Sequence, residues 1–168
     1  GAIVVGEPTS NYPMAGHKGS IKFNAAFKGV SAHGSMPQLG VNAIYKAAKA
    51  IAKLEEFQFG VQEHPVMGLP TMNVGTVEGG SGVNLVPDLA KIGVDIRTVP
   101  GMNHEELVLK LKDMLSDAEL EVFADSQAVW TEPDEEWVQR VFGICRPILK
   151  ETPTARTATC VSRWACVF

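Results

Sequence analysis

The chain contains two kinds of hydrophobic periodicity, strand-like and helical. Their order along the sequence limits the folds that it can adopt. Apolar residues alternate with polar ones in some segments, as in half-buried strands, and recur at helical spacing in others. The sequence predicts strands at 19–30, 71–78, 88–98 and 119–126, and helices at 41–57 and 103–115. The resulting order, β-α-β-β-α-β, is that of the ferredoxin-like split βαβ unit. We therefore predict an α+β fold with a four-stranded antiparallel sheet and two helices on one of its faces.

Each predicted helix has an apolar stripe. In the first helix the stripe consists of Val41, Ile44, Ala47, Ala48, Ile51, Leu54 and Phe57. Three lysines, Lys46, Lys49 and Lys53, lie off it, as expected for a solvent-facing side. The second helix follows a Pro100-Gly101 turn and begins with a capping box of Asn103 and Glu106. Its predicted apolar positions are Leu107, Leu109, Leu111, Met114 and Leu115.

The segments outside this block have a different character. Residues 2–6 read as a short buried strand, and residues 11–18 as a loop. After residue 127 the sequence predicts a linker-like turn at 130–134 and then a third helix at 134–150. Residues 151–168 follow no regular pattern. The chain also lacks an initiator Met, so we expect it to begin inside a longer protein or to be an expressed portion of one.

Composition narrows the classes of function. The chain has 168 residues, of which 45% are hydrophobic and 20% charged, as in a soluble globular protein. A net charge of -4 without a basic tract argues against a nucleic-acid partner. No apolar run approaches the roughly 20 residues that span a bilayer, so we expect no membrane partner. The three cysteines, Cys145, Cys160 and Cys166, form no recognisable disulfide framework, which favours a cytoplasmic location.

One histidine stands out by its position. His33 lies in a loop rich in Gly, Ser and Pro, between a predicted strand and a predicted helix. This is an unusual place for a core histidine and a good place for one that reaches a ligand. A lone loop histidine is nevertheless more often bonded to backbone. The residues alone therefore leave both interpretations open.

Asn84 and Arg97 are further candidates for contacts to a ligand. Asn84 follows the glycine loop 79–82, where its amide could meet a substrate. Arg97 lies near a strand end, and its guanidinium fork fits a carboxylate. The alternatives are a turn asparagine and a solvated strand arginine. The glycine loop itself is no phosphate loop, because no Gly-Lys-Ser/Thr follows it and no helix begins after it.

Glu7 directly follows the buried strand 2–6, and its carboxylate oxygens are of a kind that suits zinc. The alternative is a solvated loop glutamate. A structural or catalytic zinc needs three or four protein ligands, so one carboxylate cannot hold an ion. None of the four histidines is part of a His-x-Asp pair. The acids at 134–136 begin a predicted helix, where they complement its dipole rather than supply a general base.

Four segments in order resemble one enzyme family. They are Val5-Gly-Glu-Pro-Thr9, Gly29-Val-Ser-Ala-His-Gly-Ser-Met-Pro37 with Gly40-Val-Asn-Ala-Ile44, Gly80-Ser-Gly-Val-Asn-Leu-Val-Pro-Asp88 and Asp95-Ile-Arg-Thr-Val-Pro-Gly101. The chain resembles the co-catalytic zinc amidohydrolases, which include acetylornithine deacetylase, succinyl-diaminopimelate desuccinylase and carboxypeptidase G-like enzymes. The resemblance implies a catalytic domain with two zinc or cobalt ions, and an inserted ferredoxin-like domain that forms a homodimer.

The resemblance also implies domain boundaries. Residues 1–16 would end a catalytic-domain segment, 17–128 would form the dimerisation or lid domain, and 129–168 would return toward the catalytic domain. Relatives place a Thr/Ser-Asp pair near residues 159–162, whereas this chain has Thr159-Cys-Val-Ser162. We therefore expect the return segment to be truncated or frameshifted.

Five residue roles follow from the resemblance alone. Glu7 would be a metal ligand. His33 would cross the dimer, hydrogen-bond the substrate carbonyl in the partner's active site and stabilise the oxyanion. Asn84 and Arg97 would contact the substrate carbonyl and carboxylate, and Lys18 would be a basic residue on the substrate side.

The expected parent protein is a cytoplasmic metallopeptidase-type hydrolase that cleaves the amide bond of an N-acyl amino acid, as in amino-acid biosynthesis. We expect this chain alone to bind no zinc tightly and to be inactive. The alternative is a dimerising interaction module without catalysis.

Overall fold

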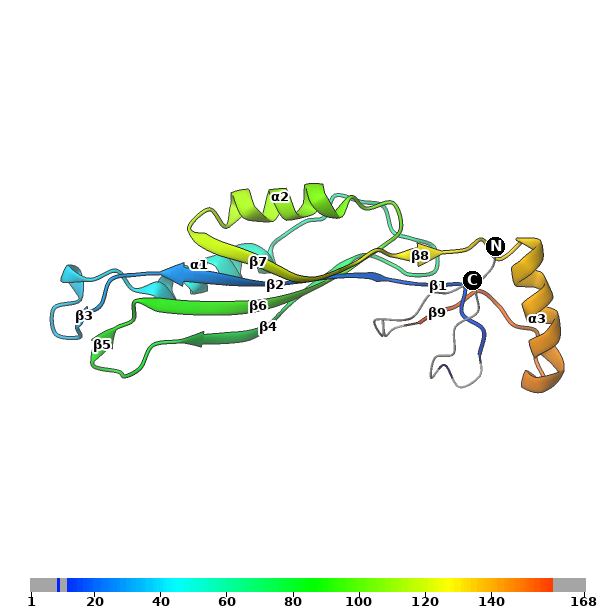
Figure 1. Ribbon diagram of the computed structural model, residues 1–168, viewed down its shortest axis with the longest axis horizontal. Coiled ribbons are helices and arrows are strands. Elements are labelled where there is room, and N and C mark those ends of the chain that lie inside the picture. Colours follow the sequence, from blue (N-terminus) through cyan, green and yellow to red (C-terminus); the bar gives the residue numbers. More distant parts are fainter. Residues whose placement is uncertain (1–8, 10–11, 159–168) are drawn as a thin grey trace.

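Four long strands form an antiparallel sheet in the order β4–β6–β2–β7 (Figure 1). The computed structural model describes residue 9 and residues 12–158. The strands are β2 (Gly19–Lys28), β4 (Thr71–Gly79), β6 (Leu89–Thr98) and β7 (Ala118–Ser126). Their positions agree with the predicted strands to within two residues at either end. The predicted α+β, ferredoxin-like fold is confirmed.

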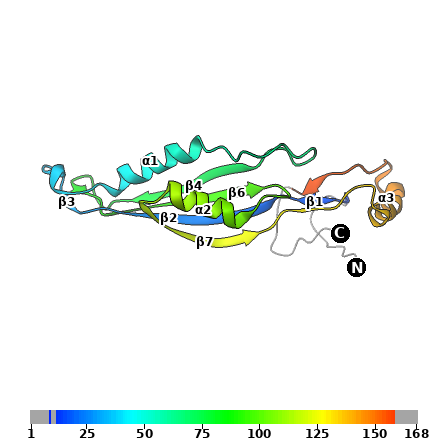
Figure 2. The same ribbon diagram turned by 90° about the horizontal axis from the view of Figure 1, so that it is seen from above.

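Two helices, α1 (Ala43–Glu55) and α2 (His104–Met114), run alongside the strands and cover one face of the sheet (Figure 2). The buried residues alternate along the two central strands, as a half-buried sheet requires. They are Ile21, Phe23, Ala25 and Phe27 of β2 and Ala90, Ile92, Val94 and Ile96 of β6. Burying one such large apolar side chain contributes about 1.5–3 kcal/mol. This single apolar layer holds both helices to the sheet.

The buried stripe of α1 differs from the predicted one. The residues that face the sheet are Ala43, Ala47, Ala50 and Leu54. Ile44, predicted to be in the stripe, is 37% exposed, and it lies beside Gly79 at the sheet edge. Three alanines in the stripe let the helix approach the sheet closely, and this turns the bulkier isoleucine outward. In α2 the predicted core residue Leu109 is likewise 65% exposed.

Short paired segments form one end of the molecule, which we call the tip. Strands β3 (Ala32–His33) and β5 (Leu85–Val86) pair antiparallel, and the short helix η1 (Pro37–Leu39) follows β3. Figure 1 shows the tip at the left, beyond the ends of the long strands. The sequence predicts a loop around His33 and assigns no element to residues 85–86.

A second small sheet lies at the opposite end. Strand β1 (Gly16–His17) lies between β8 (Val129–Trp130) and β9 (Thr157–Ala158). The predicted loop at 11–18 and linker-like turn at 130–134 therefore contain paired strands. The third helix, α3 (Glu136–Leu149), lies within the predicted range. No helix in the described part of the chain is long and apolar enough to cross a membrane. The predicted strand 2–6 lies outside the described residues.

A polar triad of two buried residues and one exposed aspartate joins three elements near this end of the sheet. His104 Nε2 lies 2.8 Å from Thr98 Oγ1, and His104 Nδ1 lies 2.5 Å from Asp125 Oδ1. Thr98 and His104 are 0% and 3% exposed. The array has the residue types of a hydrolytic triad, but the buried Thr98 hydroxyl cannot meet a substrate. It therefore connects the end of β6, the start of α2 and the end of β7.

We expect the substitution His104→Ala to lower the free energy of unfolding by about 1–3 kcal/mol, because it leaves the Thr98 hydroxyl buried without a partner. Urea denaturation followed by circular dichroism measures this change. His33→Ala is the matched control, since His33 is exposed, and it should change stability little. Equal stabilities of the two variants would contradict a structural role for the triad.

Candidate functional site

His33 lies exposed at the tip, at the end of β3. Its Nδ1 atom is turned toward its own loop, 2.8 Å from Ser35 Oγ. The backbone N–H of Ser35 also donates to Nδ1, at 3.2 Å. Among the described residues, no hydrogen bond engages Nε2. The ring is thus held by its own loop on one side and is open on the other.

Asn84 lies next to this histidine. His33 pairs with Leu85 in the β3–β5 ladder, and the Gly34 N–H donates to the Asn84 carbonyl at 2.7 Å. A Cβ on Gly34 would come within 2.9 Å of that carbonyl oxygen, so only glycine allows the approach. The structure therefore brings His33 and Asn84 together at the tip.

Arg97 and Lys18 lie at the other end of the sheet. Arg97 Nε donates to Asp95 Oδ2 at 2.9 Å, and Ser20 Oγ lies 3.4 Å from Asp95 Oδ1. This arrangement fixes the base of the guanidinium and leaves its two terminal nitrogens for another partner. Lys18 Nζ donates to the Leu69 carbonyl at 2.5 Å, and burial lowers the pKa of its ammonium below the usual 10.5.

The two pairs of candidates are far apart within one chain. Arg97 pairs with Ser20 at one end of the β2–β6 ladder, and Leu89 pairs with Lys28 at the end that leads to the tip. Eight steps along a strand at about 3.3 Å per residue separate these ends by roughly 26 Å. His33 with Asn84, and Arg97 with Lys18, therefore cannot contact the same small ligand in a single chain.

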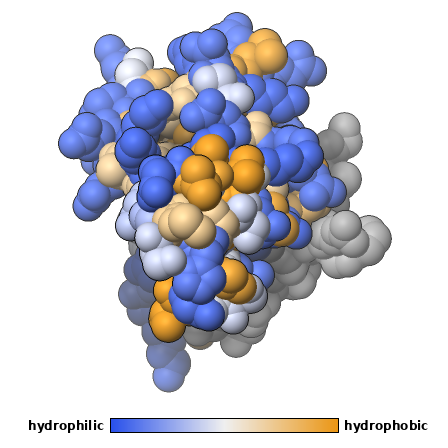
Figure 3. Space-filling view, turned by 90° about the vertical axis from the view of Figure 1, so that its left-hand side faces the viewer, coloured by the Kyte–Doolittle hydropathy of each residue, from blue (hydrophilic) through white to orange (hydrophobic). Residues whose placement is uncertain are grey.

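The surface of the tip is partly apolar. Figure 3 faces this end and shows apolar side chains gathered among hydrophilic ones. The large exposed apolar residues of the tip are Val30, Met36, Leu39, Val83 and Leu85. Apolar groups clustered on an exposed surface mark an interaction site more often than chance exposure does. The tip is therefore suited to lie against another protein surface.

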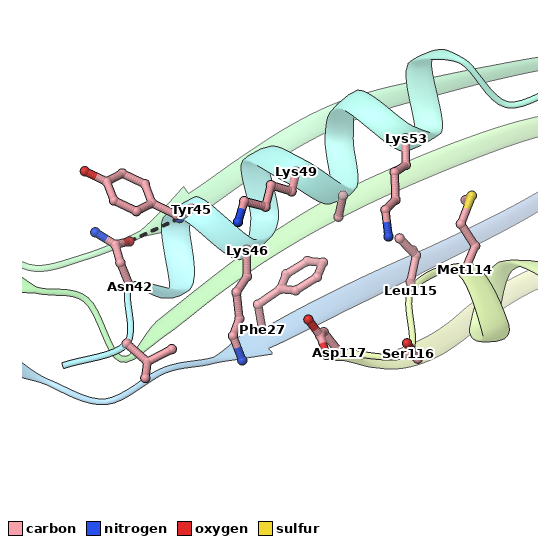
Figure 4. A pocket seen from close by; sticks show the side chains of 12 residues that line it. Phe27, Asn42, Tyr45, Lys46, Lys49, Lys53, Met114, Leu115, Ser116 and Asp117 are labelled. Atoms are coloured by element: carbon pink, nitrogen blue, oxygen red, sulfur yellow. Dashed lines mark hydrogen bonds between the residues drawn. The ribbon is translucent and has the colours of Figure 1, made fainter. Parts of the chain in front are cut away.

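A basic groove between α1 and the α2–β7 turn is a separate feature (Figure 4). Lys46, Lys49 and Lys53 line it together with Asp117 and the floor residue Phe27. None of the candidate site residues lines this groove. Its lysines are those predicted to lie off the apolar stripe of the first helix, and they form the solvated side of α1.

The described residues contain no group of three or more His, Cys, Asp or Glu that could hold a metal ion. Glu7, the candidate ligand, lies outside the described residues, as does the segment 159–162. The residues described here therefore do not fit a metal centre by themselves.

Comparison with known sequences identifies the family. Residues 15–122 match the pattern of the peptidase dimerisation domain. The chain belongs to this family. The dimerisation domain is 36% identical over 116 residues to a probable carboxypeptidase of Aspergillus fumigatus, covering 64% of this chain and 26% of that protein. It is 33% identical over 121 residues to the acetylornithine deacetylase of Vibrio atlanticus, covering 69% of this chain and 32% of that enzyme. The chain thus spans about a third or less of these relatives.

Solved structures support the fold of the dimerisation domain. The aminopeptidase PepT of Bacillus cereus matches 95% of this chain with a TM-score of 0.71 and 24% identity, over 43% of its own length. The M20 family metallo-carboxypeptidase Sso-CP2 of Sulfolobus solfataricus matches 94% with a TM-score of 0.73 and 16% identity, over 57% of its length. The predicted resemblance to deacetylases and carboxypeptidases is therefore confirmed.

Three residues around the site were not singled out from the sequence. Gly34 and Ser35 shape the His33 loop, and Asp95 holds Arg97. Asp95 could have been found, because residues two apart on a strand share a face. The roles of Gly34 and Ser35 depend on the β3–β5 pairing, for which two-residue strands carry no periodic signal.

We expect Gly34→Ala to separate β3 from β5, because the new Cβ would overlap the Asn84 backbone. Hydrogen–deuterium exchange should then become faster at residues 32–35 and 84–86, while exchange in β2 and β6 stays unchanged. Gly143→Ala is the control, since a Cβ there meets nothing within 4 Å. Unchanged exchange at the tip of Gly34→Ala would contradict the need for glycine.

Proposed function

We propose that this chain is the dimerisation and lid part of a metal-dependent hydrolase that cleaves the amide bond of an N-acyl amino acid. Membership of the peptidase dimerisation family and the similarity to acetylornithine deacetylases support this assignment. The proposed boundaries are 1–16 for the end of a catalytic segment, 17–128 for the dimerisation domain and 129–168 for the return. The observation that carries the proposal is the separation of His33 and Asn84 from Arg97 and Lys18.

A second copy of the chain would remove this separation, and the strand edges favour one way for it to bind. Strand β7 carries Glu119, Glu121 and Asp125, which protect an edge against pairing. Strand β4 carries one charge, Glu78, and its Val77 is 61% exposed. An edge with few protective charges is the better template for strand addition. We therefore assign the homodimer contact to β4.

Symmetry then determines which ends meet. A two-fold axis pairs β4 with β4 of the partner antiparallel, so Thr71 of one chain approaches Gly79 of the other. Thr71 pairs with Arg97 within its own sheet, whereas Gly79 leads into the loop before Asn84. The tip of each chain therefore points toward the Arg97 end of the partner, where β1 and β8 leave the sheet. Each complete site would use residues of both chains.

Within such a shared site the four side chains have complementary tasks. The imidazole N–H of His33 donates to the carbonyl oxygen of the scissile amide and stabilises the charge that develops on it. The Asn84 amide can donate to the same region of the substrate. Arg97, held at Nε by Asp95, presents its two terminal nitrogens to the substrate carboxylate as a bidentate fork. Lys18 adds positive charge beside it.

The metal ions belong to the intact enzyme rather than to the described residues. When bound, two zinc or cobalt ions would polarise the substrate carbonyl and activate a water molecule. Glu7 is the proposed ligand from this chain, and the other ligands would come from the remainder of the parent protein. We propose a cytoplasmic location for this parent, supported by its cysteine pattern, and no nucleic-acid or membrane partner.

We expect Val77→Glu to shift the chain from dimer to monomer. In a dimer paired through β4, the new carboxylates of the two chains would lie at the same contact and repel each other. Light scattering coupled to size-exclusion chromatography measures the mass directly. Phe123→Glu is the matched control: Phe123 is 55% exposed on the opposite edge strand, and its variant should remain a dimer. A monomeric unmodified chain, or dissociation only in Phe123→Glu, would contradict pairing through β4.

In the full-length parent, His33→Ala should lower kcat by about 10²–10³ with little change in KM, the usual loss of an oxyanion donor. Arg97→Ala should mainly raise KM. Mixing the two variants after dissociation should recover activity at about one site in four, because only mixed dimers assemble an intact site from both chains. An unchanged kcat in His33→Ala would argue against catalysis through His33. Absence of recovery in mixed dimers would argue against a shared site.

A further inference from the structure

We propose that Ser35 is a positioning residue that holds His33 in the tautomer with its proton on Nε2. This inference deepens the proposed function and rests on it, because the tautomer matters only if His33 donates to a substrate oxygen. It concerns the two contacts that Ser35 makes with the histidine ring, neither of which the family comparison explains.

The backbone contact shows which ring nitrogen accepts and which one is protonated. The Ser35 N–H donates to His33 Nδ1 at 3.2 Å. A backbone N–H can only donate, so Nδ1 must be an acceptor in the neutral ring. The proton of the neutral imidazole is then on Nε2. The hydroxyl of the same residue lies 2.8 Å from Nδ1, and there it also acts as the donor.

The surrounding turn keeps this donor in place. The Met36 N–H donates to the His33 carbonyl at 2.9 Å, and the Gly34 N–H donates to the Asn84 carbonyl at 2.7 Å. These two bonds fix the backbone on either side of the Ser35 N–H. The loop conformation and the Ser35 hydroxyl thus favour the same tautomer before any substrate arrives.

The chosen tautomer determines what the histidine can do. Nε2 faces away from the loop and makes no hydrogen bond within the described residues, so Nε2–H is available as a donor. The opposite tautomer would present a lone pair there, which repels the negative charge that develops on a carbonyl oxygen. Ser35 therefore keeps Nε2 of the exposed imidazole as a hydrogen-bond donor.

Nitrogen-15 NMR of the labelled chain tests the tautomer directly, with the His33 signals assigned by their loss in His33→Gln. When the ring is neutral, the unmodified chain should show Nε2–H almost alone. Ser35→Ala keeps the backbone N–H but loses the shorter of the two bonds to Nδ1, so it should show a measurable fraction of Nδ1–H. Ser35→Thr should restore the original state. Ser31→Ala is the matched control, because Ser31 is an exposed loop serine two residues before His33. A neutral ring protonated mainly on Nδ1, or identical spectra of Ser35→Ala and Ser31→Ala, would overturn the proposal.

Kinetics of the full-length parent test the consequence. Ser35→Ala should lower kcat about three- to tenfold at unchanged KM, the rate equivalent of losing one neutral hydrogen bond. Ser35→Thr should recover most of this loss, and Ser35→Ala should have no further effect when His33→Ala is already present. An equal loss in both backgrounds would overturn a role through His33. If His33→Ala leaves kcat unchanged, the proposed oxyanion role fails, and the spectra alone then decide whether Ser35 sets the tautomer.

Discussion

The ten-residue antiparallel pairing of β2 with β6 is the contact on which the rest of the structure depends. It places two alternating sets of apolar side chains on the same face, and these sets form the layer against which α1 and α2 pack. The outer strands β4 and β7 each pair with one member of this central pair. Because the ladder is long and regular, it also acts as a rigid spacer between the tip and the end that contains Arg97.

This spacer explains why a catalytic interpretation requires two chains. A shorter sheet could bring His33 and Arg97 to one ligand, whereas this one keeps them at opposite ends. The polar triad of Thr98, His104 and Asp125 stiffens the Arg97 end, since it connects β6, α2 and β7 beside that arginine. The tip has no comparable buried network and is held by backbone pairing between β3 and β5. Side-chain hydrogen bonds thus join the elements at one end of the molecule, and backbone pairing joins those at the other.

The long elements could be predicted from the sequence because their hydrophobic periods extend over eight or more residues. The buried stripe of α1 was predicted only in part: Ala47 and Leu54 are buried as expected. Ala43 and Ala50 were missed, because alanines give a weaker signal than the neighbouring Ile44, which is exposed. Strands β3 and β5 are too short to show a period, so their pairing beside His33 and Asn84 was not predicted. The roles of these two residues came from the family resemblance. The His104 triad also escaped prediction, since its members come from three separate elements and meet only through the tertiary fold.

The different settings of the two ends have an energetic consequence. Arg97 is half-buried and already bonded to Asp95, so part of its ordering takes place during folding. His33 and Asn84 are exposed, and water competes for every hydrogen bond they offer. Such donors become strong only where water is excluded, because the effective dielectric constant falls there. In the proposed dimer, the apolar residues of the tip would provide this exclusion by lying against the second chain. In the proposed dimer, association of the two chains and the strength of the His33 hydrogen bond would therefore be coupled.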